Sequence, residues 1–153
     1  MLRARFAALG VLTAMALAGC TQPLIVEPAL YAADPHCADV MLAVPDVLGG
    51  LAVRGTSSQA TSAWAEEFPI VARCGVEPPG PTAESCTQVD TPSVTMGWLV
   101  EEDGDDWLAV TFGHSPALEL RVPKVRADAA VGDVLAEISD AAALAPSNGL
   151  ECR

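Results

Sequence analysis

Residues 93–123 constrain the fold more than any other part of the sequence, because they alternate apolar and polar residues in three consecutive runs. The runs cover Val94–Glu101, Asp106–Phe112 and Ala117–Val122, and Asp103-Gly104 supplies a hairpin turn between the first two. Alternation of this kind is typical of strands that bury one face. The pattern therefore predicts a three-stranded antiparallel meander with one face in solvent.

Two helical segments flank this sheet in the sequence. Asp34 offers an N-cap, Pro35 suits the first helical position, and the apolar residues of 37–44 share one helical face. Residues 127–146 repeat apolar residues at helical spacing up to Pro146. Further short strands are expected at 68–74, 86–89 and near 51–54. We therefore expect an α+β fold, an antiparallel β-meander of about four to five strands covered by a short N-terminal helix and a C-terminal amphipathic helix.

The amino terminus has the features of an export signal. Arg3 and Arg5 precede an uncharged run, Phe6–Ala18. As a helix this run would span about 20 Å, whereas a bilayer core is about 30 Å thick. It is therefore interpreted as a secretory signal peptide. Leu17-Ala18-Gly19-Cys20 resembles the bacterial lipobox, and this resemblance implies cleavage before Cys20 and lipidation of its thiol.

This interpretation gives an expected organisation of the chain. Residues 1–19 are the cleaved lipoprotein signal peptide, 20–33 a tether, and 34–153 a single α+β domain. Two or three acyl chains anchor a protein stably, so we expect the domain on the extracytoplasmic face of the cell membrane, which it contacts through its N-terminal lipid. Loss of the two leader arginines lowers the formal net charge from −12 to −14, and a body this acidic is not expected to bind nucleic acid.

Four cysteines follow the lipobox: Cys37, Cys74, Cys86 and Cys152. An even number in an exported chain indicates disulfides, and three connectivities are possible. The Pro- and Gly-rich segment 75–85 favours a bond between Cys74 and Cys86, which leaves Cys37 for Cys152. Zinc is the rival interpretation. Because the sequence has no C-x-x-C pair and its two histidines lack metal spacing, we expect neither a metal nor a cofactor.

Several motifs resemble one family. The segments "HCADVMLAVP", "WAEEFPIVARCGV" and "FGHSPALELRVP", with a closing Ala-rich helix, are similar to the actinobacterial DUF3515 proteins over about residues 34–145. The resemblance implies a small secreted or lipid-anchored cell-envelope protein of unassigned function, with no catalytic residues to carry over. It also implies a link to cell-wall processes, because genes of this family often lie near a D-alanine–D-alanine ligase gene. The family pattern has Arg where this chain has His114.

Three residues are candidates for ligand binding: Arg73, Trp98 and His114. An arginine in an apolar strand is costly to bury unless it is paired, so Arg73 either binds an anion or carboxylate or points outward. Trp98 either lines a groove or packs in the core. His114 precedes Ser115, but adjacent residues rarely face each other and no Gly-x-Ser-x-Gly elbow is present, so no catalytic residue is assigned.

The acidic run 101–106 suits Ca²⁺ by its oxygen ligands, although it lacks EF-hand spacing and equally suits a charged hairpin tip. The leading hypothesis is a non-enzymatic envelope lipoprotein that binds an envelope protein or a cell-wall component. A wall-active hydrolase or transferase is one alternative, and a cation-binding envelope protein is the other.

Overall fold

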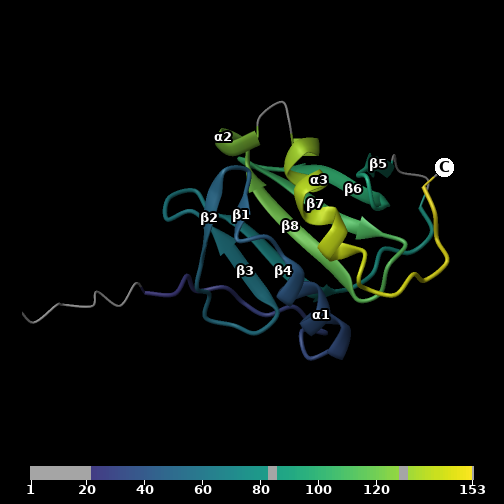
Figure 1. Ribbon diagram of the computed structural model, residues 1–153, viewed down its shortest axis with the longest axis horizontal. Helices are drawn as coiled ribbons and strands as arrows, with labels where there is room; N and C mark the ends of the chain where they lie inside the picture. Colours follow the sequence, from purple (N-terminus) through teal and green to yellow (C-terminus); the bar gives the residue numbers. More distant parts are fainter. Residues whose placement is uncertain (1–21, 83–85, 128–130, 153) are drawn as a thin grey trace, which may run out of the picture.

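A computed structural model describes residues 22–82, 86–127 and 131–152. In these residues, eight antiparallel strands form one sheet in the order β1-β2-β3-β4-β8-β7-β6-β5, with the two longer helices on one face (Figure 1). The strands are β1 (Val47–Leu48), β2 (Leu51–Arg54), β3 (Thr61–Trp64), β4 (Ile70–Val76), β5 (Cys86–Asp90), β6 (Thr95–Asp103), β7 (Asp106–Phe112) and β8 (Ala117–Pro123). The helices are α1 (Pro35–Ala43), α2 (Lys124–Ala127) and α3 (Val131–Ala142).

The predicted α+β class is confirmed, but the expected count of about four to five strands is too low. The strands that raise the count include β1 and β3, which are 2 and 4 residues long. Segments this short show too little alternation to stand out in a sequence. Gly49 and Gly50, with φ of 58° and 75°, close the β1–β2 hairpin in a conformation that other residues rarely adopt.

The predicted meander is present as β6, β7 and β8. Leu118, Leu120 and Val122 are buried, as alternation requires. In β7, however, the small residue Ala109 lies opposite Leu120, so Ala109 faces the helices, and its larger neighbours Leu108 and Val110 point to the opposite face of the sheet. The face expected to be wet therefore carries apolar side chains.

The two halves of the sheet join through a pair of strands that are distant in sequence. β4 pairs with β8, with Ala72 opposite Leu120. Consequently β4 and β5 are consecutive in the chain but lie apart in the sheet, with β8, β7 and β6 between them. Figure 1 shows β4 near the middle of the sheet and β5 at its far edge.

This topology corrects the predicted disulfides. The structure joins Cys37 to Cys74, with Cα atoms 5.5 Å apart, and Cys86 to Cys152, with Cα atoms 5.4 Å apart. A bond between Cys74 and Cys86 is wrong because four strand spacings of about 4.8 Å separate β4 from β5, roughly 19 Å in all. A disulfide requires Cα atoms within about 7 Å.

The hydrophobic core lies between the sheet and the helices. α3 buries Leu135 and Ile138 against it, and α1 packs on α3 and β4. The predicted cap of α1 is confirmed, because Asp34 Oδ1 accepts a hydrogen bond of 2.9 Å from His36 N. None of the helices in the described part of the chain is long and apolar enough to cross a bilayer.

Two terminal segments complete the domain. The N-terminal strap (residues 22–33) runs past the β2–β3 turn toward α1, and the C-terminal tail (residues 143–152) follows α3 to the Cys86–Cys152 disulfide. In Figure 1 the strap, in purple, enters at the left and runs toward α1, whereas the tail, in yellow, leaves α3 and ends at the right. Gly97 makes room for the tail, since a Cβ there would lie 2.7 Å from Cys152 Sγ.

Candidate functional site

A groove of about 670 Å³ lies on the sheet face opposite α1 and α3. Its volume falls within the usual range for ligand pockets, about 300–1,000 Å³. The strap forms one wall with Leu24, Ile25, Val26 and Glu27. Phe68 and Pro69 ahead of β4, Pro123 at the end of β8, and Lys124 and Val125 at the start of α2 also line the groove. We call this hollow the strap groove.

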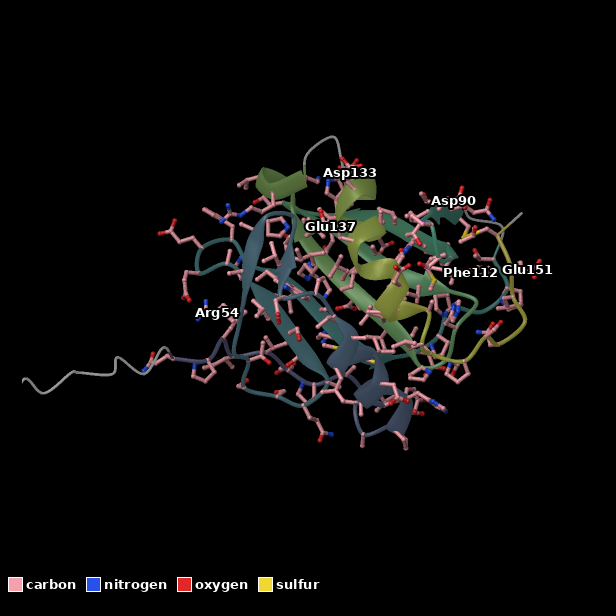
Figure 2. All side chains as sticks on the ribbon, in the orientation of Figure 1. Arg54, Asp90, Phe112, Asp133, Glu137 and Glu151 are labelled. Atoms are coloured by element: carbon pink, nitrogen blue, oxygen red, sulfur yellow. A yellow bond between two sulfur atoms is a disulfide. The ribbon has the colours of Figure 1, made fainter. Side chains whose placement is uncertain are left out.

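The strap wall is held in place by main-chain hydrogen bonds. Leu24 N donates to Gly55 O at 2.9 Å, and Leu24 O accepts from Ser57 N at 2.9 Å. The Arg54 side chain holds the start of the strap, because its Nη2 donates a 3.0 Å hydrogen bond to Gln22 O. Figure 2 shows Arg54 beside the beginning of the strap. The strap is therefore fixed to the sheet from its first described residue.

Ion pairs form the floor of the groove. Arg73 and Glu119 are opposite each other on β4 and β8, and Glu119 Oε1 accepts from Arg73 Nε at 2.8 Å and from Arg73 Nη2 at 2.7 Å. Arg121 Nη1 reaches Asp103 at 2.7 Å and Asp106 at 3.2 Å. The hydrogen bond to Asp103 is the main cause that raises the pKa of Arg121, with burial opposing it. Both arginines are thus neutralised within the protein.

The remaining lining charges are mostly acidic. Lys124 Nζ lies 2.8 Å from Glu102 and 5.4 Å from the centre of the Trp107 ring. Glu27 and Asp105 have no ion pair among the described residues. With its cations paired and two acids left, the groove does not offer an anion a free positive charge, and its apolar walls suit an uncharged group.

Exposed apolar side chains surround the mouth of the groove. Ile25 is 86% exposed, Val125 66% and Phe68 60%, and they come from three segments that are distant in sequence. Phe68 has a φ of 47°, in the left-handed region that costs a bulky residue about 1–3 kcal/mol. Single exposed apolar residues are ordinary on a surface, but a group of them around one groove marks a binding surface.

The structure does not bring the three predicted ligand-binding residues together. Arg73 lies on the groove floor. Trp98 is fully buried under α3, where its Nε1 donates to Ser139 Oγ at 3.1 Å. His114 lies in the β7–β8 connection, with Nδ1 3.4 Å from Phe112 O. Cys20, the predicted lipidation site, lies outside the described residues.

The groove residues that the sequence analysis missed are Ile25, Phe68, Glu119 and Val125. Their sequence neighbourhoods carry no motif, since the strap has no periodic pattern and Phe68 begins an ordinary apolar run. Glu119 could be linked to Arg73 only through the β4–β8 pairing, which is not local. No signal in the sequence brings these four together.

A second, smaller hollow of about 300 Å³ contains Ser115. Its lining comes from the strap, the N-cap of α1, the β4–β5 connection and the β7–β8 connection: Tyr31, Asp34, Glu77, Pro78, Ser115 and Pro116. His114 does not line it, and no hydrogen bond joins His114 to Ser115 in the described part of the chain. The geometry therefore lends no support to a nucleophile–base pair.

The acidic hairpin is occupied by protein cations. Glu102 pairs with Lys124, and Asp103 and Asp106 pair with Arg121. Over residues 22–82, 86–127 and 131–152, no group of three or more His, Cys, Asp or Glu side chains is arranged to hold a metal ion. The calcium alternative thus has no cluster of ligands in the described part of the hairpin.

Tyr31 gives a direct test of how the strap is docked. A hydrogen bond to Glu77 and the charge of that carboxylate raise the pKa of Tyr31 above its ordinary value. The folded state then holds the phenol proton more tightly than the unfolded state. The contribution of this contact to stability is therefore complete below about pH 10 and is lost as the pH rises through the folded pKa.

We expect the tyrosinate absorbance of the native protein to appear at a higher pH than in the urea-unfolded chain. Tyr31 is the single tyrosine, so the signal has one source. Glu77→Gln should return the pKa toward the unfolded value, because it removes the charge. An unchanged titration in this variant would contradict the contact.

The model of a family described as "Protein of unknown function (DUF3515)" matches residues 4–147 of the chain. No curated protein and no solved structure is found to match it.

Proposed function

This chain belongs to the DUF3515 family, and we propose that it is a lipid-anchored, non-enzymatic binding protein of the cell envelope that uses the strap groove to bind an apolar group. The observation that carries the proposal is the groove itself, with apolar walls, an exposed apolar mouth and a floor whose arginines are paired. The lipobox-like Leu17-Ala18-Gly19-Cys20 supports the anchor. The proposed binding partner of the protein is an envelope protein or a cell-wall component.

A binding role fits the chemistry of the groove better than catalysis does. General acid–base or nucleophilic catalysis needs a nucleophile, a base and a substrate position within hydrogen-bonding distance of each other. The ionic groups on the groove floor are instead used in mutual pairs: Arg73 with Glu119, and Arg121 with Asp103 and Asp106. Ion pairs of this kind fix the positions of the side chains on the floor, whereas the apolar walls provide the free energy of binding.

The test uses Nile red, a neutral apolar dye, with the full-length native protein. We expect one dye molecule to bind per chain with a blue-shifted emission. Val125→Glu should weaken binding about tenfold or more, because the bound dye would remove water from the carboxylate at the groove mouth, which costs free energy. Val125 is 66% exposed, so the variant should fold.

Leu42→Glu is the matched control, since Leu42 is 87% exposed on α1 and does not line the groove. This variant should bind the dye as the native protein does. Equal loss in both variants, or no saturable dye binding at all, would remove the groove as a binding site.

A further inference from the structure

The proposed anchor at Cys20 is only two residues before the point at which the strap is docked on the sheet. Hydrogen bonds hold the strap from Gln22 onward. Two residues span at most about 7 Å, so the Cys20 sulfur that the proposed function places at the bilayer lies about that far along the chain from the docked strap. Only Thr21 stands in the sequence between the proposed anchor and Gln22, so this anchor would hold the groove wall that begins at Leu24 close to the lipid.

We propose that the strap groove binds an acyl chain of a membrane lipid, with Ile25, Phe68 and Val125 seated among the lipids around its mouth. The inference rests on the proposed anchor at Cys20 and names the ligand class of the proposed binding site. The short connection keeps the bilayer within reach of the groove, so that a lipid can enter from the membrane without first crossing water.

The lining matches a hydrocarbon chain more closely than a charged ligand. Because Arg73 and Arg121 are already paired with carboxylates, the floor presents no free cation to a phosphate or carboxylate. Glu27 and Asp105 would repel an anion that entered. The apolar walls, by contrast, gain about 25 cal/mol for each Å² that a hydrocarbon chain removes from water.

The conformation of Phe68 points the same way. This residue lies in the left-handed region, with φ of 47°, yet its ring is 60% exposed to water at the groove mouth. The main-chain oxygens of Glu67 and Phe68 accept hydrogen bonds from Arg126, which hold this turn, but these bonds do not bury the ring. The strain becomes understandable when the ring has an apolar partner, and strained residues concentrate at binding sites.

The test places the native lipidated protein in phosphatidylcholine vesicles that carry a diazirine near the end of one acyl chain. After illumination, we expect the labelled lipid to be attached to peptides that contain Phe68, Val71 or Val125. The protein's own anchor carries no diazirine, so labelling reports a lipid of the bilayer. Added anionic phosphatidylglycerol should not increase labelling, since the body is acidic.

Phe68→Gly separates binding from folding. Glycine adopts a positive φ without strain, so the variant should be at least as stable as the native protein. Its acyl-chain labelling should nevertheless be about tenfold lower than that of the native protein, because the apolar ring is missing. Leu42→Ser, on exposed α1 and away from the groove, should label as the native protein does.

The outcomes separate this inference from the function on which it rests. A bare thiol at Cys20 in the mass of the native protein would remove the anchor and with it the proposed function. A lipidated Cys20 with no groove labelling, with labelling spread evenly over the surface, or with labelling only from a headgroup diazirine would overturn the acyl-chain site alone.

Discussion

Replacing both Cys37 and Cys74 by alanine should lower the free energy of unfolding by about 4 kcal/mol, because this disulfide closes 37 residues of chain. Small domains are stable by about 5–15 kcal/mol in total, so the variant should be close to unfolding at moderate temperature. Both cysteines are in the core, where Cys37 is 1% exposed and Cys74 is 0% exposed. Alanine at these positions leaves no buried polar group. Urea unfolding followed by tryptophan fluorescence measures the change.

A peptide map of the non-reduced native protein is the companion measurement. It should show peptides of α1 joined to those of β4, and β5 joined to the tail. A peptide with Cys74 joined to Cys86 would contradict the topology, because these residues belong to strands separated by three others.

Gly75→Ala should lower the free energy of unfolding by about 3 kcal/mol and release part of the strap. Gly75 has a φ of 95°, and a Cβ there would lie 2.4 Å from the Tyr31 carbonyl carbon and 2.5 Å from its oxygen. The obstacle is main chain, which cannot move aside without breaking the 2.8 Å hydrogen bond from Tyr31 N to Gly75 O. Backbone strain and overpacking contribute about 1–3 kcal/mol each.

Hydrogen exchange measures the release of the strap. The Tyr31 amide should exchange faster in Gly75→Ala, whereas amides in α3 should change only by the loss of global stability. Gly80→Ala is the control, because no atom lies within 4 Å of its added Cβ. That variant should be as stable as the native protein or slightly more so. Equal protection of Tyr31 in both variants would mean that the strap is not held by Gly75.

Local patterns in the sequence were sufficient to predict the meander and the helices α1 and α3, but not the short helix α2. Alternation identified β6, β7 and β8, and the Asp34-Pro35 pair identified the start of α1. These elements are specified by residues a few positions apart, which is the range over which periodicity and capping operate.

The remaining features depend on strands that meet across the sheet. The pairing of β4 with β8 decides that Arg73 meets Glu119 and that Cys74 lies far from Cys86. The groove depends in addition on the docking of the strap, which uses main-chain hydrogen bonds of Leu24 with Gly55 and Ser57 and a hydrogen bond from Val26 N to Ser57 Oγ. These contacts leave no periodic pattern in the strap sequence. A sequence can place Arg73 in a strand, but only the strand order tells which residue lies opposite it.

The order in which the cysteines pair has a consequence for biogenesis. Under the proposed export, the chain would emerge from a translocon amino end first, and the structure pairs Cys37 with Cys74 and Cys86 with Cys152, in the order of the sequence. An oxidant that joins each newly arrived thiol to its predecessor would therefore make only native bonds. On the proposed export route the chain would therefore need no disulfide isomerase, whereas the interleaved and the nested alternatives would each have to avoid the bond between the first two thiols.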